Sequence, residues 1–211
     1  GVSLELAPAE VARCVEKAGA GFLFAQSFHP AMKHVGPARK EMAVRTVFNL
    51  LGPMTNPAGT KRLVIGVFAQ RWCRPLAEAL AKLGTERAWV VYGSDGLDEI
   101  TVTGQTLVCE AVGGKTRSFV IQPKDFGLKP GKIDHLKTGS AKESAAIVRE
   151  ILASKRRDEA RSLVVMNAAA ALVIGGVAAD TMQAARMAEQ SIDSGQAQNK
   201  LDRMIQTSGK K

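Results

Sequence analysis

Cysteine is scarce in this sequence, and the few cysteines are not spaced for a disulfide framework or a zinc site. Three occur among 211 residues, at Cys14, Cys73 and Cys109, and no two of them form a Cys-x-x-Cys pair. An odd and scattered set of this kind excludes the small disulfide-stapled domains of secreted proteins. The cysteines therefore favour a reducing compartment, and we expect a cytoplasmic protein.

Aromatic residues are also few, and they do not interleave with the basic residues in any basic stretch. Phe, Trp and Tyr make up 5% of the chain, whereas the net charge is +9 and the pI is near 9.7. Proteins that bind single-stranded nucleic acid combine a basic groove with aromatic side chains on which bases stack. Because that combination is missing, nucleic acid is an unlikely partner, and the positive charge fits a phosphorylated metabolite better.

Long hydrophobic runs are absent as well. The longest apolar stretch, from Leu163 to Ala179, is 17 residues. As a helix it would span about 25 Å at about 1.5 Å per residue. A bilayer core needs about 30 Å, so this run predicts a buried core helix that ends at Gly175 and Gly176, and no membrane span.

The pattern that is present predicts an α/β fold. Residues 62–68, 75–83 and 87–92 read as strand, helix and strand, and such βαβ units pair their strands in parallel. A hairpin signal at Gly113-Gly114 adds an antiparallel pair. Capping-box signals begin a helical C-terminal region. We therefore expect a mixed, mostly parallel sheet flanked by helices, with a C-terminal helical cluster. Further expected elements are a helix at 8–18, strands at 107–112 and 117–121, caps at Ser140 and Asp180, and a loop from Asn49 to Gly59.

The segment 92–101, YGSDGLDEIT, places two adjacent carboxylates in a glycine-containing loop after an apolar strand. In open α/β sheets, ligands gather at the carboxyl ends of the strands. The oxygen ligands of Asp98 and Glu99, with no cysteine or histidine beside them, suit Mg²⁺, which shares its other positions with water and substrate phosphates. The loop taken alone is equally consistent with a solvated acidic turn.

Three segments together resemble anthranilate phosphoribosyltransferase. They are HPAMKHVGPARKE at 29–41, RTVFNLLGPMTNPAG at 45–59 and the acidic segment at 92–101, in that order. The resemblance continues through the Asn167-Ala-Ala-Ala-Ala-Leu segment and covers nearly the whole chain. It implies transfer of the phosphoribosyl group of phosphoribosyl pyrophosphate to the amine of anthranilate, with release of pyrophosphate, in tryptophan biosynthesis.

The same resemblance implies a large α/β domain like that of nucleoside phosphorylases, a small helical domain, and a homodimer. On this basis residues 1–24 and 50–211 belong to the large domain, and 25–49 form the hinge and helices of the small one. The family's glycine-rich phosphate loop and Lys-His-Gly-Asn-Arg segment would precede Gly1. The chain is therefore expected to be a C-terminal portion, inactive by itself.

The family motifs also imply roles for individual residues. Arg39 matches the arginine that binds the anthranilate carboxylate, and Ala25, His29, Met32 and Pro53 match positions that line the acceptor channel. The acidic pair, Asp98 and Glu99, matches the residues that hold Mg²⁺ beside the pyrophosphate. No side chain is expected to act as a general base, because the amine of anthranilate is already neutral at pH 7.

Two alternatives remain open on the sequence alone. One is a pyrimidine nucleoside phosphorylase-like enzyme of similar fold, with a nucleobase in place of anthranilate. The other is a non-catalytic paralogue that uses its positive charge to bind nucleic acid, with an affinity that falls steeply as salt rises.

Overall fold

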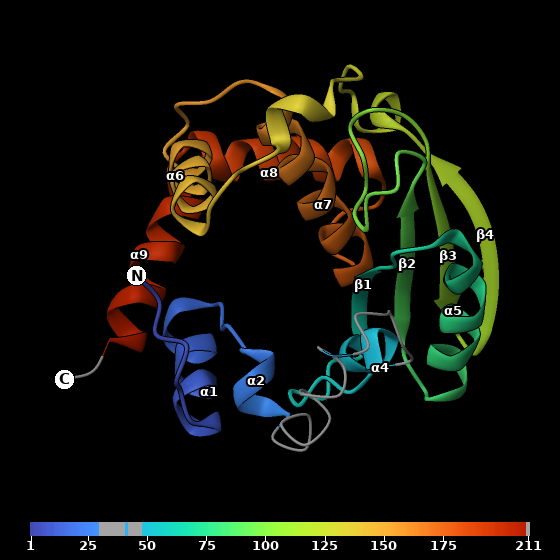
Figure 1. Cartoon of the computed structure of the whole chain (residues 1–211), viewed down its shortest axis with the longest axis horizontal. Helices are drawn as coiled ribbons and strands as arrows, with labels where there is room; N and C mark the ends of the chain where they lie inside the picture. The colour runs from blue at the N-terminus through green and yellow to red at the C-terminus, as the bar shows by residue number, and fades with distance from the viewer. Residues whose placement is uncertain (30–40, 42–47, 210–211) are drawn as a thin grey trace. The chain divides into compact units, whose positions relative to one another are not determined.

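The computed structural model describes residues 1–29, 41 and 48–209, and its contacts divide the chain into two compact units. Unit 1 consists of Gly1–Pro57 with Gly195–Lys211, and unit 2 of Ala58–Ser194 (Figure 1). The expected large domain grouped residues 1–24 with 50–211. The contacts group the first 57 residues with the C-terminal helix instead, and the assignment of residues to the family's two domains stays a prediction.

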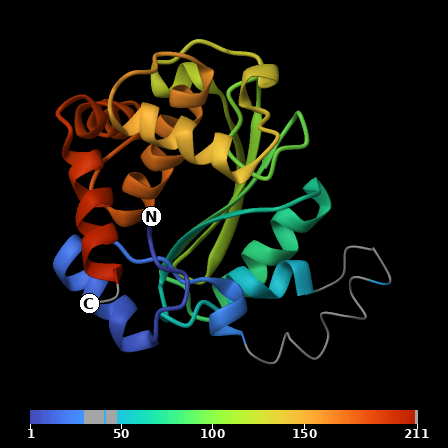
Figure 2. The ribbon, with the colours of Figure 1, turned by 60° about the vertical axis from the view of Figure 1, so that its left-hand side comes forward.

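Unit 1 is helical in its described part. Its elements are α1 (Pro8–Ala18), α2 (Ala25–Phe28), α4 (Phe48–Met54) and α9 (Gln196–Ser208). The expected helix at 8–18 is confirmed: proline occupies its first turn, and Gly19 ends it in the left-handed conformation at φ 77°. Helices α1 and α9 lie side by side, as Figures 1 and 2 show. Leu6, Val11 and Cys14 form a small buried core, against which Leu23 and Phe28 pack.

The loop expected from Asn49 begins later than the sequence indicated. Helix α4 runs through Pro53 to Met54, so the prediction of a loop at 49–53 was wrong. Pro53 removes one backbone donor from the last turn of this helix. The buried side chain of Leu50 gives this short helix an apolar contact that the local breaker signals do not reveal. Non-helical chain then follows Thr55, and Gly59 has a positive φ of 62°.

Unit 2 contains a four-stranded mixed sheet in the order β1-β2-β3-β4. The strands are β1 (Arg62–Gly66), β2 (Arg87–Gly93), β3 (Thr106–Val112) and β4 (Lys115–Ile121). The parallel pairing of β1 with β2 and the β3–β4 hairpin are confirmed. Because β2–β3 and β3–β4 are both antiparallel, parallel pairs are not the majority among the described strands.

Helices pack on this sheet as the strand-helix-strand pattern indicated. Helix α5 (Cys73–Lys82) connects β1 to β2 and packs on β2, β3 and β4, whereas α7 (Glu159–Gly175) contacts β1 and β2 (Figure 1). Four consecutive residues of β2, Ala88 to Val91, are buried, as expected for a strand covered on both faces. The remaining elements of unit 2 are α6 (Ala141–Leu152), α8 (Thr181–Asp193) and the short 3₁₀ helices Gln70–Trp72, Pro123–Phe126 and Ile133–Leu136.

Helix α7 confirms the reading of the longest apolar run as a core helix. From Leu163 on its residues are apolar except for Asn167, it packs against β1, β2 and α8, and Gly176 ends it at φ 73°. Across the described ranges, no helix is both long enough and apolar enough to cross a bilayer.

The two expected N-caps are confirmed. In a capping box the residue three positions later also accepts the N–H of the cap residue, and here it accepts the N–H of the residue before the cap instead. The Ser140 hydroxyl accepts from the Glu143 N–H at 3.2 Å, and the Asp180 carboxylate accepts from the Gln183 N–H at 2.8 Å. Glu143 and Gln183 reach back past the cap and accept the N–H of Gly139 and Ala179, respectively. These bonds satisfy orphan donors at the starts of α6 and α8.

Candidate functional site

The candidate site is the loop that follows β2. This strand ends at Gly93, and the chain reverses direction through Gly96, whose φ of 89° favours glycine. The N–H of Gly93 donates to the carbonyl of Leu97 at 2.8 Å, and the N–H of Gly96 donates to the carbonyl of Gly93 at 2.9 Å. The loop therefore closes on the end of the strand, where ligands of α/β sheets bind.

Asp95 holds the loop together through hydrogen bonds to other residues of the loop. Its carboxylate accepts from the hydroxyls of Thr101 and Thr103, at 2.5 and 2.7 Å, and from the N–H of Leu97 at 3.1 Å. Partial burial acts to raise the pKa of Asp95, but the hydrogen bonds from Thr101, Thr103 and the backbone outweigh it, so the pKa lies below its usual value. With its oxygens engaged in these bonds, Asp95 shapes the loop and is poorly placed to bind a ligand.

Asp98 and Glu99 are exposed, as Asp95 is. Within the described residues, neither carboxylate has a hydrogen-bond or ion-pair partner. Partial desolvation, followed by the repulsion of the Asp98 charge, raises the pKa of Glu99 above its ordinary value. A cation bound to both carboxylates would remove this repulsion.

The donor set fits magnesium better than a metal that binds through protein side chains alone. The described ranges contain no group of three or more His, Cys, Asp or Glu side chains that could hold an ion. Mg²⁺ characteristically uses one or two carboxylates and completes its octahedron with water and substrate phosphates. Two exposed carboxylates at the end of a strand meet that requirement.

Glycine at the end of β1 allows the acidic loop to approach the sheet. A Cβ atom at Gly66 would overlap the carbonyl oxygen and carbon of Asp98. Glycine is therefore required at position 66, where the end of β1 touches the acidic loop. Sequence reasoning missed Gly66 and Asp95 as parts of the site, and it missed Asn167 of α7, whose amide hydrogen-bonds to the backbone of Ile100. Only the short spacing of Asp95, Thr101 and Thr103 in the sequence could have signalled the internal hydrogen bonds.

The other candidate residues belong to unit 1 or lie outside the described residues. Ala25 is the first residue of α2 and is exposed. At the other end of that helix, the N–H of His29 donates to the Ala25 carbonyl at 2.9 Å. Pro53 is exposed near the end of α4. Met32 and Arg39 lie outside the described residues. The structure thus brings Ala25 and His29 together on one helix, and Asp98 and Glu99 together on one loop; the roles of all these residues stay predictions.

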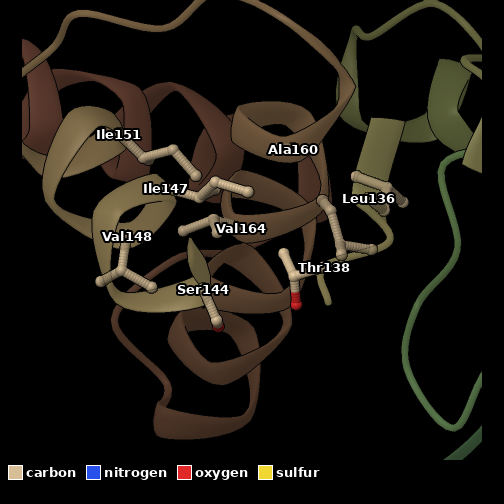
Figure 3. A pocket seen from close by; sticks show the side chains of 9 residues that line it. Leu136, Thr138, Ser144, Ile147, Val148, Ile151, Ala160 and Val164 are labelled. Carbon is tan, nitrogen blue, oxygen red and sulfur yellow. The ribbon is translucent and has the colours of Figure 1, made fainter. Parts of the chain in front are cut away.

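A separate pocket of about 140 Å³ lies elsewhere in unit 2. Figure 3 shows that its lining side chains come from α6, α7 and the segment that precedes α6. None of the nine lining residues is charged: Leu136, Thr138, Ser144, Ile147, Val148, Ile151, Ala160, Leu163 and Val164. The pocket therefore lacks the groups that would bind a diphosphate, and it is distinct from the acidic loop.

The fold and the loop together define an α/β domain with two adjacent exposed carboxylates in the loop at the carboxyl end of a parallel strand. The model of the glycosyl transferase family, a/b domain, matches residues 1–198, and the chain belongs to this family. It is 50% identical over 208 residues to the anthranilate phosphoribosyltransferases of Rubrobacter xylanophilus and Agrobacterium fabrum. Those matches cover 99% of this chain and 61% and 60% of the relatives, so the chain spans about three-fifths of their length.

Solved structures of the same family superpose closely on this chain. The crystal structure of anthranilate phosphoribosyltransferase from Thermus thermophilus has a TM-score of 0.91 at 40% identity, and the match covers 99% of this chain and 61% of that one. The Saccharomyces cerevisiae enzyme in complex with phosphoribosyl pyrophosphate and Mg has a TM-score of 0.86 at 27% identity, covering 97% and 59%. The expected α/β fold and the family resemblance are thereby confirmed.

Proposed function

We propose that the natural gene product containing this chain is an anthranilate phosphoribosyltransferase. It transfers the phosphoribosyl group of phosphoribosyl pyrophosphate to the amine of anthranilate, gives N-(5-phosphoribosyl)anthranilate and pyrophosphate, and serves tryptophan biosynthesis. The observation that carries this proposal is the exposed carboxylates of Asp98 and Glu99 after β2, in a chain that is 50% identical to a curated enzyme of that name.

The acidic pair is assigned to the leaving-group side of the reaction. Displacement at an anomeric carbon passes through a cation-like transition state, and the main electrostatic task is to stabilise the charge that develops on the departing pyrophosphate. Mg²⁺, when bound, supplies that stabilisation as a Lewis acid. Asp98 and Glu99 hold the ion, and a yeast relative has been solved with phosphoribosyl pyrophosphate and Mg.

The acceptor side is assigned by resemblance to residues of the first 57. Arg39 binds the anthranilate carboxylate, and Ala25, His29, Met32 and Pro53 line the channel for the aromatic ring. A relative from Saccharomyces cerevisiae has been solved in complex with 4-fluoroanthranilate, which supports such a channel in the family. The aromatic amine is neutral at pH 7, so no side-chain base is needed to make it nucleophilic. Positioning of the two substrates alone can lower the barrier by several kcal/mol.

The Arg39 assignment has its own test. A hydrogen bond between charged groups contributes about 1.5 to 3 kcal/mol, so Arg39→Ala should raise the KM for anthranilate about ten- to a hundredfold. Arg39→Lys keeps the charge but loses the planar fork, and it should recover only part of the affinity. A KM for anthranilate that barely changes in Arg39→Ala would remove Arg39 from the site.

Assembly and compartment complete the proposal. We propose a homodimer on the family resemblance and a cytoplasmic location on the cysteines. The three thiols are free and buried in the structure, which agrees with a reducing environment. Sedimentation of the natural gene product would test the dimer.

The central experiment measures anthranilate consumption by the natural gene product in the presence of phosphoribosyl pyrophosphate and Mg²⁺. We expect transfer that depends on Mg²⁺. The double variant Asp98→Asn/Glu99→Gln should lower turnover about a hundredfold or more and weaken the response to Mg²⁺.

A matched control removes two exposed carboxylates elsewhere in unit 2. Asp134→Asn/Glu78→Gln makes the same change in charge at residues whose side chains are 77% and 47% exposed. It should leave turnover and the Mg²⁺ response unchanged. Phosphorolysis of a pyrimidine nucleoside without transfer to anthranilate would instead identify the phosphorylase alternative, and salt-sensitive nucleic-acid binding without either activity would identify the non-catalytic one.

A further inference from the structure

Asn167 lies in the middle of α7 and is the one polar residue in the apolar run from Leu163 to Ala179. Its amide makes three hydrogen bonds. The Oδ1 atom accepts from the Ile100 N–H at 3.0 Å, and Nδ2 donates to the Ile100 carbonyl at 3.1 Å and to the Leu163 carbonyl at 3.0 Å. Asn167 therefore pairs with both backbone groups of one residue, as a neighbouring β-strand would.

Nothing about helix formation asks for asparagine at this position. Asparagine is a weaker helix former than the alanines that follow it, and an amide inside an apolar helix must find partners or lose free energy. Asn167 directs two of its three bonds to a segment 67 residues away in the sequence. The presence of asparagine at position 167 is thus explained by its hydrogen bonds to this distant segment.

Asn167 holds the residue next to the acidic pair. Ile100 directly follows Glu99, and its side chain is fully buried, so the chain cannot rotate freely at this point. On the other side, the backbone of Asp98 lies against Gly66. The next residue, Thr101, is held by its N–H bond to the Thr106 hydroxyl at 3.0 Å and by its bond to Asp95.

The acidic pair consequently sits on backbone that is fixed at both ends while its side chains stay exposed. Two adjacent carboxylates repel one another, and a flexible loop would let them separate. Ligands of a metal bind more tightly when other groups hold them in place before the ion arrives. Asn167 supplies the part of this support that comes from α7.

We propose that Asn167 is a positioning residue for the cation site, which fixes Glu99 and Asp98 through the backbone of Ile100 without touching the ion or the substrate. This inference rests on the proposed function, in which the two carboxylates hold Mg²⁺. It adds a helix residue remote in sequence to the groups that determine metal affinity.

The test uses the natural gene product and compares Asn167→Ala with Val165→Ala. Alanine suits the helix, so Asn167→Ala removes the amide without a helix penalty. Val165 is a fully buried residue of α7 whose apolar side chain cannot hydrogen-bond to the loop, so Val165→Ala lowers stability by leaving a cavity in the core. Thermal unfolding of both variants checks that their losses of stability are comparable.

The measured quantity is the affinity for Mn²⁺, a paramagnetic substitute for Mg²⁺, titrated in the presence of pyrophosphate and followed by electron paramagnetic resonance. Asn167→Ala should weaken Mn²⁺ binding about ten- to a hundredfold, the range found when groups that orient metal ligands are removed. Val165→Ala should bind like the wild type. In activity assays, Asn167→Ala should raise the Mg²⁺ concentration for half-maximal activity and leave the KM for anthranilate unchanged.

Equal Mn²⁺ affinity in the two variants would overturn the proposal, as would a wild type that binds no Mn²⁺. Should Asn167→Ala fail to fold, Asn167→Asp keeps an acceptor for the Ile100 N–H but loses both donors. Native hydrogen exchange at Ile100 then reports whether the contact was weakened, and Mn²⁺ affinity must fall with it. A wild type that binds Mn²⁺ but transfers nothing to anthranilate contradicts the proposed function, and the Mn²⁺ comparison still decides the role of Asn167.

Discussion

Glu110 lies directly opposite Trp89 in the antiparallel β2–β3 pair, and its carboxylate accepts a hydrogen bond from the indole N–H at 3.0 Å. The same buried carboxylate accepts from Arg87 at 2.8 Å and from Arg117 at 2.5 Å. Burial alone would raise the pKa of Glu110, but the hydrogen bonds from Trp89, Arg87 and Arg117 together hold it below its usual value. One carboxylate thus joins β2, β3 and β4.

Glu110→Ala should therefore be strongly destabilising. It leaves the half-buried Arg87 and the Trp89 indole without their partner, and breaking a buried pair in this way costs about 3 to 5 kcal/mol. The free energy of unfolding, measured by urea titration, should fall by that amount. Glu86→Ala is the control because it breaks an exposed pair with Arg62, which is worth about 0 to 1 kcal/mol. Similar losses in the two variants would contradict the role given to Glu110.

Asp193 should make stability depend on pH in acid. Hydrogen bonds from the Ser154 hydroxyl and Arg157, together with the charge of Arg161, lower the pKa of Asp193 from 3.8 to about 2. A carboxyl whose pKa is lower in the folded state stabilises the fold above pH 3.8, and this stabilisation is lost as the pH falls toward about 2.

The variant Asp193→Asn should consequently be less stable than the wild type near neutral pH, and the difference should shrink below pH 3.8. The effect should be modest, because the Asp193 side chain is 38% exposed and solvent screens its ion pairs. Urea titrations of both proteins at a series of pH values measure this difference. A difference that stays constant into acid would show that Asp193 contributes nothing through its charge.

Gly66→Ala should displace the acidic loop. The new methyl group would overlap the Asp98 carbonyl, so either β1 or the loop must move, and overpacking of this kind costs about 1 to 3 kcal/mol. We expect a lower midpoint of thermal unfolding together with a higher Mg²⁺ requirement. Gly175→Ala is the control: its methyl group would meet the nearest atom, on Val177, at 3.6 Å, and alanine favours the helix. A Gly66→Ala protein as stable as Gly175→Ala would refute the close contact.

The cysteines should be unreactive in the folded protein. Burial, with a smaller contribution from Cys109, raises the pKa of the Cys73 thiol to about 12, and all three cysteines are buried. The thiolate is the reactive form, so maleimide at about pH 8 should label the native protein slowly and the denatured protein fully. Val120→Cys, at a position that is 50% exposed on β4, should label at once. Rapid labelling of Cys73 without denaturant would show that unit 2 opens readily.

The sequence predicted those parts of the fold whose signals are local. Apolar residues at helical spacing and a glycine at the end indicated α1, and the pattern of strand, helix and strand indicated the parallel pairing of β1 with β2. Ser140 and Asp180 cap the helices that they were expected to cap. These features are legible because a turn, a cap or an amphipathic stripe depends on residues only a few positions apart.

Signals that conflict within a few residues were less reliable. The glycine and proline at 52 and 53 indicated a loop, whereas the structure forms α4 there. The expectation of a mostly parallel sheet did not hold for the described strands, because a hairpin signal shows that β3 and β4 pair but not whether β3 runs parallel or antiparallel to β2.

The sequence by itself determined the family, the acidic pair and the apolar core helix, since these depend on residue type and short spacing. Only the tertiary structure decided what holds the acidic pair. The backbone of Gly66 meets that of Asp98, and Asn167 pairs with Ile100 across 67 residues of chain. Contacts of this kind leave no local pattern, because their geometry exists only after the sheet and α7 have packed together.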